Sequence, residues 1–186
     1  MSGVDDFGRR LLDASLLEGD FTLRSGKRSR WYVDKYRFET EPALLREIGE
    51  RLATTAKQVE PDVDRLGGPA LGAVALAASA AMASGLPFII VRGETKGYGT
   101  ANRLEGPYEP GEVVCLVEDV VTSGGALCEA VEAVRAAGLV VRHAVCVVDR
   151  EEGGADALAR LGVRLASLYR AGELLATREQ VVNPHG

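Results

Sequence analysis

The feature that most constrains this fold is the segment 113–126, where an apolar strand runs into two adjacent carboxylates and a Thr-Ser-Gly-Gly turn. Residues 113–117 are apolar throughout, which is typical of a parallel strand covered on both faces. Residues 124–137 then repeat apolar side chains at helical spacing and stop at Gly138. A buried strand joined to a helix by a tight turn predicts a layered α/β fold, with this turn at the carboxyl end of the strand.

The chain repeats this alternation on both sides of that segment. Because strands separated by helices are joined by right-handed crossovers, the pattern predicts a parallel sheet with helices on both faces. Ligands collect at the carboxyl ends of the strands in such sheets. The polar tail from Thr177 is expected to fray. The predicted strands are 63–66, 87–91, 112–118, 139–149 and 163–169, and the predicted helices between them are 70–84, 124–137 and 154–161.

Residues 1–40, which we call the hood, are expected to hold a helix and a hairpin. The helix is predicted over 4–17, where apolar side chains recur on one face. The hairpin 21–34 has Ser-Gly at its centre and aromatic or β-branched residues in its second arm. A helix over 41–58 follows the hood, with Thr40 as its predicted cap.

Composition excludes several classes of function. At 186 residues the chain is expected to form one domain, 1–186, that needs no disulfides. The net charge of −5 argues against a general nucleic-acid binder. Residues 66–91 carry no charge, but glycine, proline and alanine interrupt them in a way that argues against a membrane span. The widely spaced Cys115, Cys128 and Cys146 favour a reducing cytoplasm, and no pair has metal-ligand spacing.

The turn after the strand has the chemistry of a sugar-phosphate site. The glycine pair 124–125 lets the backbone approach an anion, while free amides and the helix dipole supply positive potential. The hydroxyls of residues 122–123 add donors. Glu118 and Asp119 are suited to accept hydrogen bonds from sugar hydroxyls or to face a magnesium-bound ligand. The simpler alternative is a tight turn that only caps a helix.

This segment resembles the ribose-phosphate-binding signature of type I phosphoribosyltransferases, in which two acids precede a Thr-rich glycine turn. Three further segments resemble the orotate phosphoribosyltransferases: 21–34 their amino-terminal hairpin, 92–99 their mobile catalytic loop, and 148–154 a later landmark. The four segments occur in the same order as in that family, which makes the resemblance more specific than any one segment would. The resemblance implies the type I α/β fold, a parallel sheet flanked by helices, with a small hood that binds the base.

The resemblance implies a role for each landmark. The paired acids would hold the ribose hydroxyls, the turn would hold the sugar phosphate, and Arg92 and Lys96 would act as catalytic cations on the departing diphosphate. Residues expected to bind 5-phosphoribosyl diphosphate (PRPP) are Arg92, Lys96, Tyr98, Glu118, Asp119, Val120, Val121, Thr122, Ser123, Gly124, Gly125 and Ala126. Residues expected to bind orotate are Thr122, Arg150, Arg24 and Tyr32.

Arg150 follows the predicted strand 139–149 and would project from the ligand edge of the sheet. Its planar fork can bind a carboxylate through two parallel hydrogen bonds, which suits orotate. The resembled family places its orotate-binding arginine in the same Asp-Arg-x-Glu-Gly context. Without that context, a surface pair with Glu151 or Asp149 is the simpler explanation.

Three other motifs leave alternatives open. The loop 93–110 is either a lid over the site or an exposed excursion, and its Gly93 stands where many family members carry a second lysine. The glycine-rich turn 67–72 either binds an anion through its amides or allows close packing. Trp31 and Tyr32 alternate on a strand, so at most one of them meets the base, and Tyr32 matches the family position better.

The resemblance implies transfer of the phosphoribosyl group from PRPP to orotate, giving orotidine monophosphate and diphosphate. Mg²⁺ would be held largely by substrate oxygens, with no protein ligand assigned. It also implies a homodimer in which the 93–110 loop is shared between subunits, and we expect no nucleic-acid or membrane partner and a cytoplasmic location. Two alternatives stay open: a phosphoribosyltransferase for another base, and a non-catalytic protein that senses PRPP.

Overall fold

The computed structural model of the protein describes residues 4–22, 28–93 and 103–182. Strands and helices alternate over most of the chain after residue 65. The helices are α1 (Asp6–Ser15), α2 (Lys35–Glu39), α3 (Pro42–Val59), α4 (Val74–Ser84), α5 (Gly125–Ala136), α6 (Gly154–Arg160) and α7 (Ala171–Val182). The strands are β1 (Leu16–Thr22), β2 (Arg28–Val33), β3 (Arg65–Pro69), β4 (Phe88–Val91), β5 (Leu104–Glu105), β6 (Val113–Val121), β7 (Val140–Asp149) and β8 (Arg164–Arg170).

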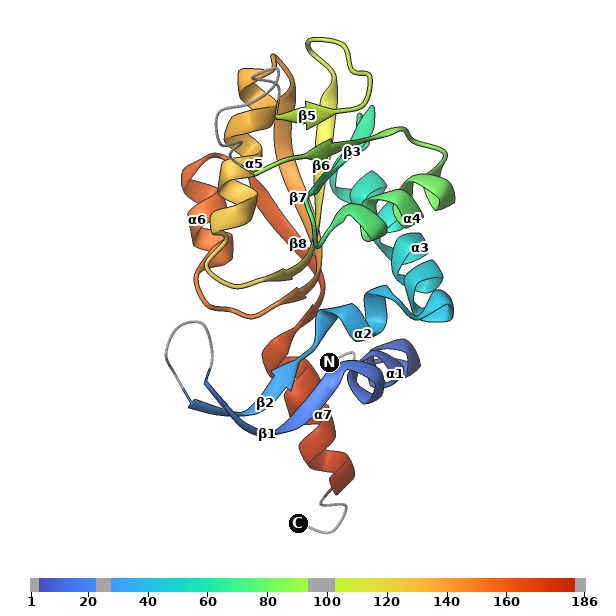
Figure 1. Cartoon of the computed structure of the whole chain (residues 1–186), viewed down its shortest axis with the longest axis vertical. Helices are drawn as coiled ribbons and strands as arrows, with labels where there is room; N and C mark the ends of the chain where they lie inside the picture. The colour runs from blue at the N-terminus through green and yellow to red at the C-terminus, as the bar shows by residue number, and fades with distance from the viewer. Residues whose placement is uncertain (1–3, 23–27, 94–102, 183–186) are drawn as a thin grey trace.

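The main sheet has the strand order β5-β4-β3-β6-β7-β8. Its neighbouring strands are parallel except for the short edge strand β5, which pairs antiparallel with β4. Helices α5 and α6 cover one face of the sheet, and α3 and α4 cover the other (Figure 1). The predicted parallel sheet with helices on both faces is therefore confirmed, with β5 as an antiparallel addition inside the loop 93–110.

Strand β6 contributes to both hydrophobic cores because successive side chains of a strand point to opposite faces. Cys115 and Val117 are buried in the core that α3 and α4 cover. Val114 and Leu116 are buried in the core that α5 and α6 cover. The alternation does not continue to the end of the strand, because Val120 packs against the first of these cores and Val121 is buried in the second.

The hood lies beyond the carboxyl ends of the parallel strands, where α1 and α7 also meet (Figure 1). Strands β1 and β2 form an antiparallel hairpin, with Leu16 opposite Val33. The Tyr169 hydroxyl on β8 donates to Asp5 Oδ1 at 2.5 Å, and Arg51 Nη1 on α3 lies 2.8 Å from Asp5 Oδ2. These contacts tie the first helix to the body of the molecule.

The predicted helix 4–17 is too long at both ends. Helix α1 ends at Ser15, and Leu16 and Leu17 begin β1 instead. Both leucines fit the apolar spacing of a helix, so the local pattern did not reveal the change. Their pairing with β2 decides it, because this pairing satisfies their backbone groups in the hairpin.

The predicted cap of the third helix is wrong by one residue. Glu41 takes the cap position of α3, and its carboxylate accepts a hydrogen bond from the Leu44 amide at 2.8 Å. Thr40 instead ends α2, a short helix that the sequence pattern did not predict. Because α2 ends directly before α3 begins, Thr40 belongs to the end of α2 and the next residue caps α3.

Strands β3 and β6 extend beyond their predicted bounds, and the helix α7 was not predicted. Strand β3 continues to Pro69 instead of ending at 66, and β6 continues to Val121 instead of ending at 118. Thr177 lies inside α7, where fraying was expected. Buried Leu174 packs this helix into the core. Glycines, acids and polar tails carry a weak local signal, so sheet pairing and packing decided these boundaries.

The uncharged stretch 66–91 divides into most of β3, the whole of α4 and β4. Helix α4 begins at Val74, four residues later than predicted. Within the described ranges, no helix is both long and apolar enough to cross a bilayer.

A buried carboxylate at the end of α3 gives the fold a pH dependence. The Glu60 carboxylate accepts hydrogen bonds from Arg142 Nε at 2.9 Å and Nη2 at 2.7 Å, and it lies 2.9 Å from His143 Nδ1. The hydrogen bonds from Arg142 lower the pKa of Glu60 from 4.5 to about 2. Because the folded pKa is depressed, the stabilisation is complete above about pH 4.5 and is lost as the pH falls toward 2.

We therefore expect Glu60→Gln to lower the free energy of unfolding by about 2 kcal/mol at pH 7, since Arg142 is half exposed and solvent screens part of the interaction. Urea denaturation should show that this difference shrinks between pH 4.5 and pH 2. Asp62→Asn is the matched control, because the exposed Asp62 carboxylate lies 3.9 Å from the same guanidinium. It should change stability by less than about 0.5 kcal/mol. A pH-independent loss for Glu60→Gln would contradict this role.

Candidate active site

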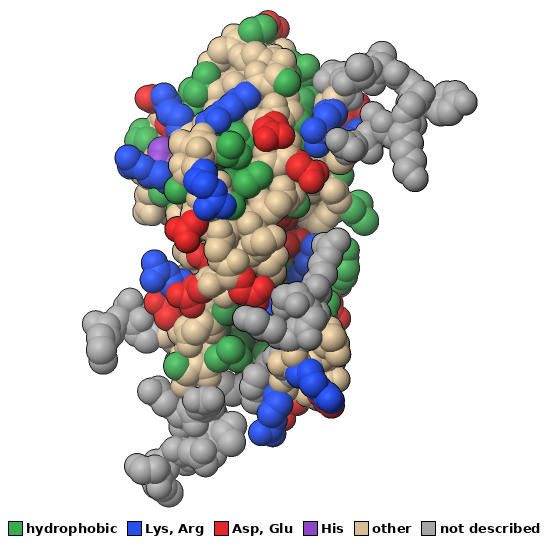
Figure 2. Space-filling view, turned by 90° about the vertical axis from the view of Figure 1, so that its left-hand side faces the viewer, with side chains coloured by type: hydrophobic (Ala, Val, Ile, Leu, Met, Phe, Trp, Pro, Cys, Tyr) green, Lys and Arg blue, Asp and Glu red, His purple; other side chains and the backbone are tan. Residues whose placement is uncertain are grey.

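A cavity of about 640 Å³ lies between the hood and the carboxyl ends of β6 and β7. We call it the hood pocket, and its size is ordinary for a site that holds a small ligand. Figure 2 shows acidic and basic side chains close together near this junction. The pocket is lined by Thr22, Tyr32, Val33, Lys35, Asp119, Val120, Thr122, Ser123, Arg150 and Glu152. The structure thus brings together six of the predicted site residues: Tyr32, Asp119, Val120, Thr122, Ser123 and Arg150.

The turn between β6 and α5 presents backbone and hydroxyl groups to this pocket. Thr122 and Ser123 are exposed, and no side chain caps the amino terminus of α5. Gly124 adopts φ = +80°, a conformation that favours glycine. A Cβ atom at Gly124 would lie 3.0 Å from the Cα and carbonyl oxygen of Gly154, so the backbone of two loops meets here. Free amides at a helix start, beside two hydroxyls, suit a phosphate group.

The paired acids both lie inside β6, which continues past its predicted end at 118 and so includes Asp119 as well as Glu118. Glu118 is 7% exposed and Asp119 2% exposed. Asp119 lines the hood pocket, whereas Glu118 is not among its lining residues. Asp119 Oδ2 accepts a hydrogen bond from Lys35 Nζ, and Asp119 Oδ1 accepts one from the Val120 amide. Of the two acids, Asp119 is therefore the one positioned to meet a ligand.

Several carboxyl groups gather around Asp119. Burial, with the nearby charge of Asp119, raises the pKa of Glu118 and of Glu39 well above the usual range. Burial alone would lower the pKa of Lys35, but the hydrogen bond and charge of Asp119, together with the nearby Glu39 and Tyr36, outweigh this effect and raise it. The cluster therefore favours a charged Lys35–Asp119 pair flanked by protonated glutamic acids.

Arg150 lies directly after β7 at the mouth of the pocket. Its amide donates to the Val121 carbonyl at 2.9 Å, which joins the ends of β6 and β7. Its guanidinium Nη2 lies 2.9 Å from Glu152 Oε1. Asp149 accepts instead from the Glu151 amide at 2.9 Å, so neither acid of the expected surface pair holds the guanidinium. Arg150 thus faces the pocket with a carboxylate already beside it.

The hairpin supplies an aromatic wall. Tyr32 is 44% exposed, lines the pocket and packs its ring against Phe21 with centroids 5.5 Å apart. An exposed aromatic ring held by a second ring offers a flat apolar surface to a planar ligand. The predicted orotate contact Arg24 lies outside the described residues.

Several named proteins and one protein family are similar to this chain in sequence. The phosphoribosyl transferase domain family matches residues 37–160 of the chain. The orotate phosphoribosyltransferase of Methanocella arvoryzae is 50% identical over 157 residues, which cover 84% of this chain and 88% of that protein. That of Halobacterium salinarum is 46% identical over 176 residues, or 94% and 98% of the two chains. The chain belongs to the orotate phosphoribosyltransferase family.

Crystal structures of family members agree in fold. The orotate phosphoribosyltransferase from Aeropyrum pernix superposes with a TM-score of 0.84 at 32% identity, covering 93% of this chain and 98% of that one. The Mycobacterium tuberculosis enzyme in complex with 5-phospho-alpha-D-ribosyl 1-diphosphate has a TM-score of 0.72 at 29% identity, covering 91% and 96%. The expected type I phosphoribosyltransferase fold is therefore confirmed.

Of the segment 92–99, which resembles the mobile catalytic loop of the family, the structure describes only residues 92 and 93. Lys96 and Tyr98 lie outside the described residues. Arg92 does not line the hood pocket: its Nη1 lies 3.0 Å from Glu105 Oε1, and both side chains are about half exposed. The structure therefore does not bring Arg92 to the other predicted residues.

The remaining predicted PRPP contacts lie around the turn. Val121 is buried at the end of β6, whereas Gly125 and Ala126 are exposed in the first turn of α5. These two residues contribute free amides at the helix start, next to Thr122 and Ser123. Their exposure agrees with a role for the backbone and requires none for the side chains.

The glycine-rich turn 67–72 packs closely at its start and reaches the candidate site at its end. A Cβ at Gly67 would lie 2.8 Å from Leu116 Cδ2, and one at Gly68 would lie 2.8 Å from Ala77 Cβ, so these two glycines allow close packing. Gly72 instead faces Asp119 at the hood pocket. The packing explanation holds for the strand, and only the last glycine lies at the candidate site.

Some pocket residues were not found from the sequence, although the family likeness located the site itself. Thr22 ends β1 next to the hairpin turn, Val33 ends β2 at the opposite end of the hairpin, and Glu152 follows Arg150 closely. Lys35 carries no local signal, because a lysine that starts a short helix is usually only solvated. Its partner Asp119 is 84 positions away, so only the tertiary structure reveals the pair.

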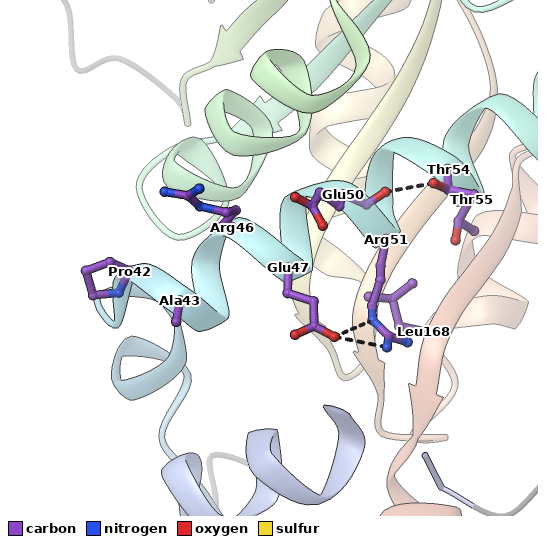
Figure 3. A pocket seen from close by; sticks show the side chains of 9 residues that line it. All are labelled: Pro42, Ala43, Arg46, Glu47, Glu50, Arg51, Thr54, Thr55 and Leu168. Atoms are coloured by element: carbon purple, nitrogen blue, oxygen red, sulfur yellow. Dashed lines mark hydrogen bonds and ion pairs between the residues drawn. The ribbon is translucent and has the colours of Figure 1, made fainter. Parts of the chain in front are cut away.

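A second, larger hollow of about 800 Å³ follows the outer side of α3 beside Leu168 on β8 (Figure 3). We call it the α3 groove. Two of its charged side chains, Arg51 and Glu47, pair along the helix at 3.1 Å. It contains none of the residues that the family likeness assigns to a ligand. Self-paired surface charges of this kind are typical of a solvated helix face.

Proposed function

We propose that this chain transfers the 5-phosphoribosyl group of PRPP to orotate, giving orotidine monophosphate and diphosphate. The observation that carries this proposal is the hood pocket, which Arg150, Tyr32 and Asp119 line together with the first two residues of the uncapped turn 122–126. The pocket thus offers a fork for a carboxylate, a flat ring for a base, amides for a phosphate and an acid for hydroxyls. The names of the close relatives support the same substrates.

The proposed reaction is a displacement at the anomeric carbon. The bond from this carbon to the diphosphate oxygen breaks, and diphosphate leaves with the electron pair. The orotate ring nitrogen supplies the electron pair of the new carbon–nitrogen bond and loses its proton, which passes to the departing diphosphate or to water. The transition state resembles an oxocarbenium ion, so the protein acts mainly by alignment and by stabilising the departing charge, without a covalent nucleophile.

The chain's own groups divide this work. The amides and hydroxyls of residues 122–126 hold the sugar phosphate, and Asp119 accepts hydrogen bonds from the ribose hydroxyls. Arg150 and Thr122 bind orotate while Tyr32 packs against its ring. We also propose that Arg92 and Lys96 reach the departing diphosphate when the loop closes over the ligand, which would require Arg92 to leave Glu105.

Magnesium remains part of the proposal. Among the described residues, no group of three or more His, Cys, Asp or Glu side chains is placed to hold a metal ion. The buried carboxylate of Asp119 at the pocket is a hard oxygen ligand that fits Mg²⁺, while the phosphates and hydroxyls of PRPP would supply most of its ligands. When bound, the ion would reduce the negative charge on the diphosphate.

The homodimer and the cytoplasmic location also remain predictions. If each 93–110 loop completes the partner's site, an inactive Lys96→Ala chain and an inactive Arg150→Ala chain should complement each other. Mixing them at equal concentration after reversible dissociation should restore about a quarter of the parental rate, since about half of the dimers are mixed and each has one intact site. Activity assays on each variant alone provide the control. No recovery, despite proven subunit exchange, would contradict the shared loop.

The activity itself is tested with purified protein, PRPP and Mg²⁺, following orotate by its ultraviolet absorbance. We expect orotidine monophosphate from orotate, and no nucleotide from uracil, adenine or guanine. Product from one of those bases and not from orotate would support the alternative of another base specificity. PRPP binding without product from any base would support a non-catalytic sensor.

A further inference from the structure

Lys35 brings the hood into the candidate site. It is the first residue of α2, and its Nζ donates to Asp119 Oδ2 at the hood pocket, which both residues line. The Lys35 side chain is 31% exposed, whereas that of Asp119 is 4% exposed. The ammonium group is therefore partly open to the pocket, while its partner is fixed in β6.

The turn after β3 leaves room for this ammonium group. A Cβ atom at Gly72 would lie 2.4 Å from Lys35 Nζ and 2.3 Å from Asp119 Oδ2. Any side chain at this position would displace the ion pair. The glycine therefore creates a space, between Asp119 and the turn, that the hood fills with a positive charge.

The position of Lys35 matters for an anionic substrate because a carboxylate lies beside it in the pocket. The Asp119 carboxylate is paired with the ammonium group, and it would repel phosphate groups if no cation were present. Among the residues that line the pocket, Lys35 and Arg150 carry positive charge, and Arg150 lies beside Glu152 beyond β7. Lys35 is thus the lining cation next to the proposed ribose-binding acid.

We propose that Lys35 binds the diphosphate group of PRPP. On this view, which rests on the proposed function, ribose hydroxyls replace the ammonium group as the hydrogen-bond donors to Asp119. The ammonium group then pairs with diphosphate oxygens on the side of the pocket where Gly72 lies. The flexible stem of lysine permits a movement of a few ångströms without movement of the hood backbone.

A purely structural role is the competing explanation, because the Lys35–Asp119 pair also holds the hood to the sheet. The two roles separate when binding is measured apart from stability. Lys35→Met removes the charge while keeping a side chain of similar length. Arg37→Met is the matched control, since it removes an exposed positive charge from the same short helix.

Calorimetric titration of the full chain with inorganic diphosphate, and separately with PRPP, tests the proposal in magnesium-containing buffer. We expect Lys35→Met to weaken both affinities by about tenfold to 30-fold, the usual effect of one lost charge-assisted hydrogen bond. The KM for orotate should change by less than about threefold, because Lys35 does not contact the base in this proposal. Lys35→Arg should keep most of the affinity, and Arg37→Met should keep all of it.

Unchanged affinity of Lys35→Met for diphosphate and PRPP, even with a lowered melting temperature, would overturn the proposal. If that variant does not fold, Lys35→Gln carries the same expectation and can still donate to Asp119. Failure of the proposed function looks different: the parental chain would form no orotidine monophosphate, whatever Lys35 does to diphosphate binding.

Discussion

Replacement of Arg150 by alanine is expected to raise the KM for orotate by at least about 100-fold, while the affinity for PRPP changes by less than about threefold. The backbone of Arg150 is fixed at the pocket because its amide donates to the Val121 carbonyl at 2.9 Å, and the residue lines the pocket. Its fork can make two charge-assisted hydrogen bonds to the carboxylate of orotate, and alanine makes neither. Steady-state kinetics with each substrate varied in turn measures both effects.

Two further variants sharpen this prediction. Arg150→Lys keeps the charge but loses the fork, so it should recover only part of the orotate affinity. Glu152→Gln should lower the KM for orotate slightly, since the Glu152 carboxylate, 2.9 Å from Arg150 Nη2, competes with that of the substrate. Equal orotate dependence in Arg150→Ala and the parental chain would refute the assignment of this arginine to orotate.

Gly124→Ala is expected to weaken PRPP binding by about 100-fold, measured by calorimetry. The new Cβ would lie 3.0 Å from the Cα and carbonyl oxygen of Gly154, and φ = +80° strains any residue with a side chain. Relief of this contact requires the turn to move, which displaces the amides that are proposed to hold the sugar phosphate. A shift of about 1 Å in such a site has a large cost because hydrogen-bond geometry is strict.

Gly138→Ala separates backbone strain from the effect on the site. Gly138 also has a positive φ, of +82°, but it precedes β7, and its nearest contact for a Cβ is Pro110 Cβ at 3.6 Å. Both variants should lose about 1 kcal/mol of stability. Only Gly124→Ala should lose PRPP affinity. A similar loss in the two variants, or none in Gly124→Ala, would contradict a phosphate site at this turn.

The sequence was sufficient where the signal is local. The apolar run 113–117 and the helical spacing after Gly124 predict β6 and α5. Both patterns depend only on residues that are close together in the sequence. The turn between them was predicted for the same reason. The family likeness then located Tyr32 and Arg150, which the structure brings to the same pocket.

The boundaries could not be predicted where long-range pairing decides them. Two carboxylates usually signal the end of a strand, yet β6 continues past them because Glu118 lies opposite Cys146 and Val121 opposite Asp149 on β7. This extension fixes Asp119 toward the hood pocket and Glu118 away from it. The difference in role between the two acids follows from the pairing and is invisible in their sequence.

Lys35 shows the same limit for the site. Its neighbours predict only a polar position near a hairpin, and its function as a partner of Asp119 depends on how the hood sits against the sheet. The absence of a side chain at Gly72 completes the arrangement from a third part of the chain. The role of the Lys35 charge depends on the contact of three distant segments, so no local sequence pattern could have predicted that role.

A crystal structure of the protein with orotidine monophosphate bound would test the central claim most directly. We expect the phosphate at the amides of residues 122–126, the ribose hydroxyls at Asp119, and the base between Tyr32 and Arg150. Nucleotide bound in the α3 groove, or in the hood pocket with its phosphate away from the 122–126 turn, would contradict the account.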